Sequence, residues 1–256
     1  MSRRLENLEY NNTQTLDLHL VEETGRPLVV CIHGGGFVSG SKADERCRQS
    51  AALLNQAGIN CASVSYSLAP PEDRFAKWPR NLIDIADAIA WLHNAAEQYA
   101  YDFARLGLLG YSAGCCFSNL YTLGAEQLFA TFSYPPPVYK PLALAGFYGP
   151  YDFPSRQAER KSTDDELNLL HSPSYWFECN GEHAPPVLHV HGNLDTVVYP
   201  DQHEWFQSDY WSRKLSFKAI IADGFGHSFA PLDRNDKGEQ IDLRDEIADF
   251  FTQHLG

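Results

Sequence analysis

The chain has 256 residues, of which 44% are hydrophobic and 21% charged, and its formal net charge is −13. These values predict a globular protein with a large core, and the acidic balance argues against a nucleic-acid partner or an anionic membrane surface. No run is long and apolar enough to predict a membrane span. Six cysteines without zinc-site spacing predict buried, reduced thiols and a cytoplasmic protein. The sequence leaves the oligomeric state open.

Apolar runs and helical spacing alternate along the chain. Two short strands are expected within 7–23. Further strands are predicted at 27–32, 60–68, 105–110, 141–149, 186–191 and 215–222, and helices at 43–57, 79–99, 113–128, 201–213 and 238–254. This alternation predicts an α/β fold with a mostly parallel sheet and helices on both of its faces. We expect a single domain over 1–256, in which the polar, irregular stretch 151–185 is a small lid-like insertion.

Four segments carry chemically useful residues at the expected carboxyl ends of strands. They are HGGGF at 33–37, GYSAG at 110–114, Asp195 in VHGNLD and His227 in DGFGH. Parallel sheets place their functional groups beyond these strand ends. The four segments are therefore expected to meet at one edge of the sheet.

Ser112 lies between two glycines where a buried strand should turn into a helix. Such a turn exposes the central side chain and needs small residues two positions before and after it. A serine hydroxyl is a weak nucleophile and needs a base. His227 can take its proton and Asp195 can orient the imidazole, and the chain order Ser, Asp, His is that of α/β-hydrolases.

The glycines that follow His33 suggest a site for negative charge. Backbone N–H groups of Gly35, Gly36 and Ala113 are expected to converge on one point and bind the oxyanion of a tetrahedral intermediate. His33 itself is expected to fix this loop by a hydrogen bond.

Several of these motifs resemble the α/β-hydrolase superfamily, and most closely its HGGG-type esterase branch, which includes hormone-sensitive-lipase-like and small carboxylesterase-like enzymes. The matching segments are HGGGFVSGS, YSLAP at 66–70, GYSAG, HSPSYW at 171–176, HGNLDTVVYPDQ at 191–202 and GFGHSF. The resemblance implies a serine hydrolase acting on esters, with Ser112, Asp195 and His227 as its triad. It departs from the lipase pattern GDSAGG at Tyr111 and Cys115. Because only 32 residues precede His33, we expect the nearly capless esterases or related formamidases.

Other residues allow competing interpretations. Asp152 is a second candidate acid, although we expect it to make structural contacts. His189 and His191 alternate on a predicted strand, and we expect them to point to opposite faces and to share no metal. His203 is expected at the surface. Phe37 and Tyr111 are candidate substrate-binding residues.

The leading functional hypothesis is hydrolysis of carboxylic esters of small to medium, partly apolar molecules through an acyl-enzyme, with no metal or organic cofactor. An arylformamidase or other amidase would use the same residues on a C–N bond. A small-molecule receptor or a non-hydrolytic biosynthetic enzyme on the same fold is the remaining alternative.

Overall fold

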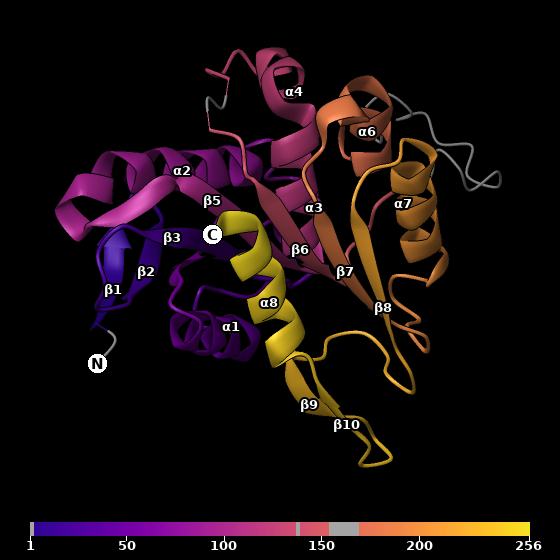
Figure 1. Cartoon of the computed structure of the whole chain (residues 1–256). Helices are drawn as coiled ribbons and strands as arrows, with labels where there is room; N and C mark the ends of the chain where they lie inside the picture. Colours follow the sequence, from indigo (N-terminus) through magenta and orange to yellow (C-terminus); the bar gives the residue numbers. More distant parts are fainter. Residues whose placement is uncertain (1–2, 137–138, 154–168) are drawn as a thin grey trace.

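The computed structural model describes residues 3–136, 139–153 and 169–256, and an eight-stranded sheet forms its centre (Figure 1). The strand order is β1-β2-β4-β3-β5-β6-β7-β8. β1 and β2 run antiparallel at one edge, and all pairings from β4 to β8 are parallel. The mostly parallel sheet is therefore confirmed. The strands are β1 (Arg3–Glu9), β2 (Thr15–Leu20), β3 (Arg26–Ile32), β4 (Asn60–Val64), β5 (Tyr101–Tyr111), β6 (Ala143–Phe147), β7 (Val187–Gly192) and β8 (Phe217–Ala222).

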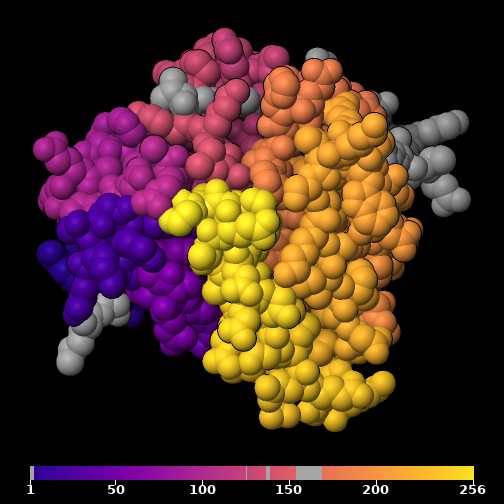
Figure 2. All heavy atoms as spheres, viewed as in Figure 1, coloured from indigo at the N-terminus to yellow at the C-terminus, as the bar shows by residue number. Residues whose placement is uncertain are grey.

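Helices cover both faces of this sheet. The central strand β3 shows why: Leu28 and Val30 pack into one core cluster, while Val29 and Cys31 pack into another on the opposite face. The first cluster includes residues of α2 (Arg80–Tyr99), α3 (Ala113–Asn119), α4 (Ala125–Thr131), α6 (Pro173–Asn180) and α7 (Asp201–Ser212). The second includes α1 (Glu45–Gln56) and α8 (Arg244–Leu255). Figure 2 shows α8, in yellow, on the face nearest the viewer. Among the described helices, none has the length and hydropathy needed to cross a bilayer.

The helix predicted at 113–128 is interrupted. It consists of α3, a π-helical turn η1 (Leu120–Gly124), and α4. Polar side chains at the junction bond carbonyls four residues back: Ser118 Oγ donates to Gly114, and Thr122 Oγ1 to Ser118. Such bonds compete with the regular helical ladder, which periodicity alone does not show.

Other expected bounds also differ from the structure: β4 ends at Val64 rather than at 68, and β5 begins at Tyr101 rather than at 105. The final helix begins at Arg244 rather than at 238, because Gly238 has φ +80° and lies in the turn of a hairpin between β9 (Leu232–Arg234) and β10 (Gln240–Asp242). The stretch 151–185, expected to be irregular, contains α6 and a 3₁₀ turn η2 (Gly181–His183). Residues 154–168 of the predicted lid-like insertion lie outside the described residues.

Candidate active site

The turn between β5 and α3 presents Ser112. Its backbone has φ 49° and ψ −114°, an unfavourable conformation for a residue with a side chain. A Cβ on Gly110 would lie 2.4 Å from the Gly114 carbonyl oxygen, and one on Gly114 would lie 2.1 Å from the Ile32 oxygen. Both flanking glycines are therefore required by close backbone contacts, as the sequence predicted.

Ser112, His227 and Asp195 form one chain of hydrogen bonds. The Ser112 hydroxyl lies 2.9 Å from His227 Nε2, and His227 Nδ1 lies 2.7 Å from Asp195 Oδ2. A carboxylate accepts, so Nδ1 carries the proton and Nε2 is free to accept from the serine. The structure thus brings together three residues that are far apart in the sequence, with the order of contacts needed for proton transfer.

Asp195 is buried yet remains ionised. Burial raises its pKa, but hydrogen bonds from His191, His227 and the backbone N–H groups of Val198 and Val197 outweigh this and hold the pKa well below its usual value. His191 Nε2 lies 3.3 Å from Oδ2. The carboxylate therefore stays charged beside His227 at neutral pH.

The loop after β3 passes close to Ser112 at Gly34 and continues into Gly35 and Gly36. Gly35 and Gly36 have φ +119° and +59°, and a Cβ on Gly34 would lie 3.2 Å from Ser112 Cβ. Within the described residues, the N–H groups of Gly35 and Gly36 donate to no other group. Ala113 is the first residue of α3, so its N–H has no partner within the helix. This arrangement can stabilise negative charge beside the serine.

His33 fixes the start of this loop. Its Nδ1–H donates to the Gly34 carbonyl at 2.6 Å, and its ring stacks on Tyr66 with centroids 4.2 Å apart. The Tyr66 hydroxyl donates back to the His33 carbonyl. Burial lowers the pKa of His33 to about 4, so the ring is neutral at physiological pH.

We expect the free energy of unfolding to fall as the pH drops from about 6.5 to about 4. Burial lowers the pKa of His33 and of His171 to about 4, so in this window the unfolded chain binds protons that the folded chain does not. Each such histidine changes the free energy of unfolding by about 1.4 kcal/mol per pH unit in this window. Urea unfolding at a series of pH values measures it. His171→Gln should flatten the dependence, and an unchanged slope in that variant would contradict the assignment.

Phe37 and Tyr111, predicted together as substrate-binding residues, lie in different core clusters. Phe37 borders a narrow pocket beside the Gly35–Gly36 loop. Tyr111 instead points into the opposite core, where it is fully buried and its hydroxyl bonds Ser50 at 2.6 Å. Its side chain is therefore no part of this pocket, and that prediction was wrong. The described lining residues are Phe37, Phe75, Trp78, Asn81, Cys116, Phe117, Leu120, Phe153 and His171.

Asp152 makes structural contacts. Its carboxylate accepts a hydrogen bond from the Ser174 hydroxyl, and its backbone N–H donates to Gln202 Oε1 at 2.7 Å. Asp195, not Asp152, is the carboxylate bonded to His227. The contact between His191 and the Asp195 carboxylate was not predicted. Its sequence signal is that His191 lies four residues before Asp195 in the segment that matches the family.

The histidine predictions need correction. His189 and His191 are two positions apart and therefore share a face of β7, because it is neighbouring positions that alternate. His203, expected at the surface, is only 2% exposed and lies against His189. The three rings form one buried group.

A family comparison matches most of the chain. The family model described as BD-FAE matches residues 16–210, which is 195 of the 256 residues. The chain is 28% identical to "Esterase LipC" of Mycobacterium tuberculosis over 222 residues, which is 81% of this chain and 54% of that protein. It is 32% identical to "Probable N-octanoylanthranilate hydrolase AqdA2" of Rhodococcus erythropolis over 194 residues, 68% of this chain and 41% of that protein. The chain thus spans about half the length of these relatives.

Solved structures share the fold. The butyrate-bound esterase Est2 of Thermogutta terrifontis superposes with a TM-score of 0.78 at 18% identity, over 100% of this chain and 94% of that one. At this identity the likeness speaks for the fold alone. The expected α/β-hydrolase fold is confirmed.

Proposed function

The chain belongs to the BD-FAE family, and from this premise we propose that it is a serine hydrolase that cleaves carboxylic esters of small to medium, partly apolar molecules. The observation that carries the proposal is the hydrogen-bond chain from Ser112 through His227 to the buried Asp195. The esterase name of the relative LipC supports the same reaction.

In the proposed mechanism, Ser112 Oγ attacks the ester carbonyl carbon while His227 Nε2 takes its proton. Asp195 holds the imidazole in the required tautomer and stabilises the imidazolium. The tetrahedral intermediate collapses, the C–O bond breaks, and His227 returns the proton to the leaving alcohol. In the second half, His227 Nε2 takes a proton from water while the water oxygen attacks the acyl carbon. The bond to Ser112 Oγ then breaks, the proton returns to Oγ, and the carboxylic acid is released. None of these steps calls for a metal or an organic cofactor.

The oxyanion of the intermediate would accept from the N–H groups of Gly35, Gly36 and Ala113. These donors have fixed positions before substrate binds, so their alignment costs no reorganisation during the reaction. The bond between His33 and the Gly34 carbonyl supports this loop.

We expect Gly36→Ala to lower kcat by about 10²- to 10³-fold with little change in KM, as for loss of one oxyanion donor. A Cβ at Gly36 meets no atom within 4 Å, but its φ of +59° strains an alanine, so the loop should relax and turn the N–H away. Gly25→Ala is the matched control, because Gly25 has φ +67°, also with free space, in a turn outside the site. Steady-state kinetics of both variants measure the effect; equal losses in the two would contradict the assignment.

The pocket beside Phe37 is the proposed acyl site. Phe37 follows the oxyanion glycines directly and Cys116 lies one turn after Ser112, and both line this pocket; on this basis we place the acyl group of the substrate there. Its described walls are mostly aromatic rings, which suit a small, apolar acyl group. With p-nitrophenyl esters, we expect kcat/KM to be higher for acetate and propionate than for octanoate. A preference for octanoate would contradict this placement.

Two reactions test the proposal as a whole. A fluorophosphonate probe should label Ser112 and no other residue. Absence of labelling in correctly folded protein would favour a small-molecule receptor. Turnover of p-nitrophenyl acetate, compared with that of an N-formyl aromatic amine, distinguishes ester from amide hydrolysis.

A cytoplasmic location is also part of this proposal. All six cysteines are free thiols and five of them are buried, which suits a reducing compartment.

A further inference from the structure

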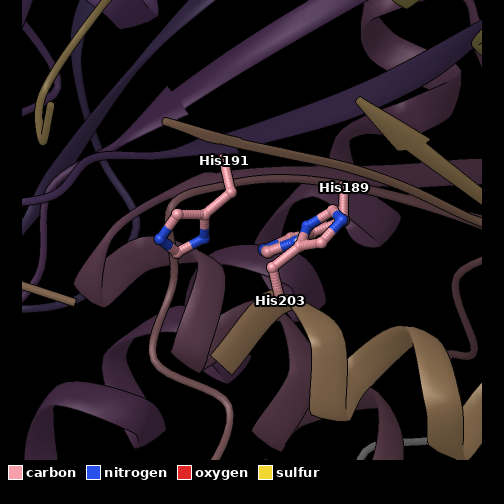
Figure 3. Close-up of side chains that lie close together, drawn as sticks. All are labelled: His189, His191 and His203. Carbon is pink, nitrogen blue, oxygen red and sulfur yellow. The ribbon is translucent and has the colours of Figure 1, made fainter. Parts of the chain in front are cut away.

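Three buried histidines lie side by side next to the candidate active site. His189 and His191 project from one face of β7, and His203 comes from the first turn of α7 (Figure 3). His189 Nδ1 and His203 Nδ1 are 2.7 Å apart. One ring nitrogen from each of the three residues lies within 4.8 Å of the others.

The protein core alone does not satisfy this group. In the described part of the chain, His189 Nε2 and His191 Nδ1 are buried without a hydrogen-bond partner. The surroundings are apolar, with Phe206 and Phe217 packed against the His189 and His203 rings. Unpaired polar atoms in such a place cost folding free energy that apolar side chains would not.

We propose that His189, His191 and His203 form a binding site for one divalent transition-metal ion of the zinc class. Three imidazole ligands with a fourth position open to water are a common zinc arrangement. Nitrogen donors favour Zn²⁺, Co²⁺ or Ni²⁺ over Mg²⁺ and Ca²⁺, which prefer oxygen.

The orientation of His191 suits a metal ligand. Its Nε2 lies 2.8 Å from the Val198 carbonyl oxygen, which can only accept, so Nε2 carries the proton and Nδ1 keeps a free lone pair. Metal-binding histidines commonly donate their second nitrogen in this way to a carbonyl or carboxylate. Nε2 also lies 3.3 Å from Asp195 Oδ2, so the same ring borders the candidate triad.

Binding requires a small rearrangement. Nitrogen ligands of a tetrahedral zinc ion stand about 3.3 Å apart, given bonds of about 2.0–2.1 Å, so the contact between His189 and His203 must widen. In this arrangement His189 and His203 both bind through Nδ1. The ring whose Nδ1 carried the shared proton changes to the tautomer protonated on Nε2, so each imidazole remains neutral. Of the two unpaired nitrogens, His191 Nδ1 becomes a ligand and His189 Nε2 does not. The bound ion would link β7 to α7 across 193–200, the segment that carries Asp195.

The test uses the full chain in two preparations, one from zinc-supplemented growth and one equilibrated with Co²⁺ after purification. Growth with zinc supplies the ion during folding, before the site is buried. We expect one ion per chain by elemental analysis, a tetrahedral Co²⁺ absorption without a thiolate charge-transfer band, and a Tm rise of about 5 °C. His203→Gln and His189→Gln should each weaken Co²⁺ binding more than about 100-fold.

His183→Gln is the control, because His183 is exposed on η2, and it should bind as the wild type does. The absence of an ion from both preparations would overturn the proposal. A thiolate charge-transfer band would place the ion at a cysteine instead of at the three histidines. Wild-type Co²⁺ affinity in a folded His203→Gln chain would likewise show that the ion binds elsewhere. Each of these readouts is independent of ester hydrolysis.

Discussion

Replacing Ser112 with alanine is expected to lower kcat for p-nitrophenyl acetate by about 10⁴- to 10⁶-fold. The change removes the nucleophile and the donor to His227 Nε2, whose distance from Oγ is 2.9 Å. Residual turnover would come from the oxyanion donors and from substrate binding. Steady-state kinetics, with single-turnover assays for the slow variant, measure the loss.

The fold should tolerate this substitution. Alanine and serine pay a similar cost for the φ of 49° at this position, so the Tm should change little. Ser118→Ala is a matched control from the same helix: it removes a hydroxyl that donates to the Gly114 carbonyl at 2.9 Å and should keep near-wild-type kcat. Residual activity of Ser112→Ala above a few per cent would exclude Ser112 as the nucleophile.

The sheet and the site's main contacts could be read from the sequence because each depends on a short, local pattern. Continuous apolar strands such as 27–32 require cover on both faces. Gly110 and Gly114 are required beside Ser112, because an added Cβ would come as close as 2.1 Å to a backbone oxygen. Strand ends of a parallel sheet then bring Asp195 and His227 to the same edge without any further information.

The features that could not be predicted from the sequence depend on the direction of side chains and on local capping of helices. Tyr111 is a candidate substrate-binding residue by sequence, but as the last residue of β5 it points into the core on the opposite face of the sheet from Phe37. The stretch 151–185 was expected to be irregular, yet Pro173 within it occupies the first turn of α6, where proline is favoured. The polar His203 faces inward on α7, a helix whose weak amphipathic pattern does not mark its buried side.

Asp195→Asn is expected to lower kcat/KM on the order of 10⁴-fold. The asparagine amide carries no negative charge, so it no longer holds His227 in the tautomer that leaves Nε2 free to accept a proton. The carboxylate is also the acceptor for the N–H groups of Val197 and Val198 at 2.8 and 3.0 Å. These two donors should keep the side-chain oxygen of asparagine turned toward them and its nitrogen toward His227. The variant is therefore expected to fold, with His227 held in the tautomer that carries its proton on Nε2 and cannot accept the serine proton.

Asp152→Asn is the comparison that decides the acid. Both carboxylates are buried, but Asp152 accepts from Ser174, a contact that asparagine can keep. We therefore expect less than about a tenfold loss of kcat/KM from Asp152→Asn, with unfolding followed in both variants to separate activity from stability. If the two substitutions were equally damaging at equal stability, the hydrogen bond between Asp195 and His227 would not be the one that governs turnover, and the acid would have to be reassigned.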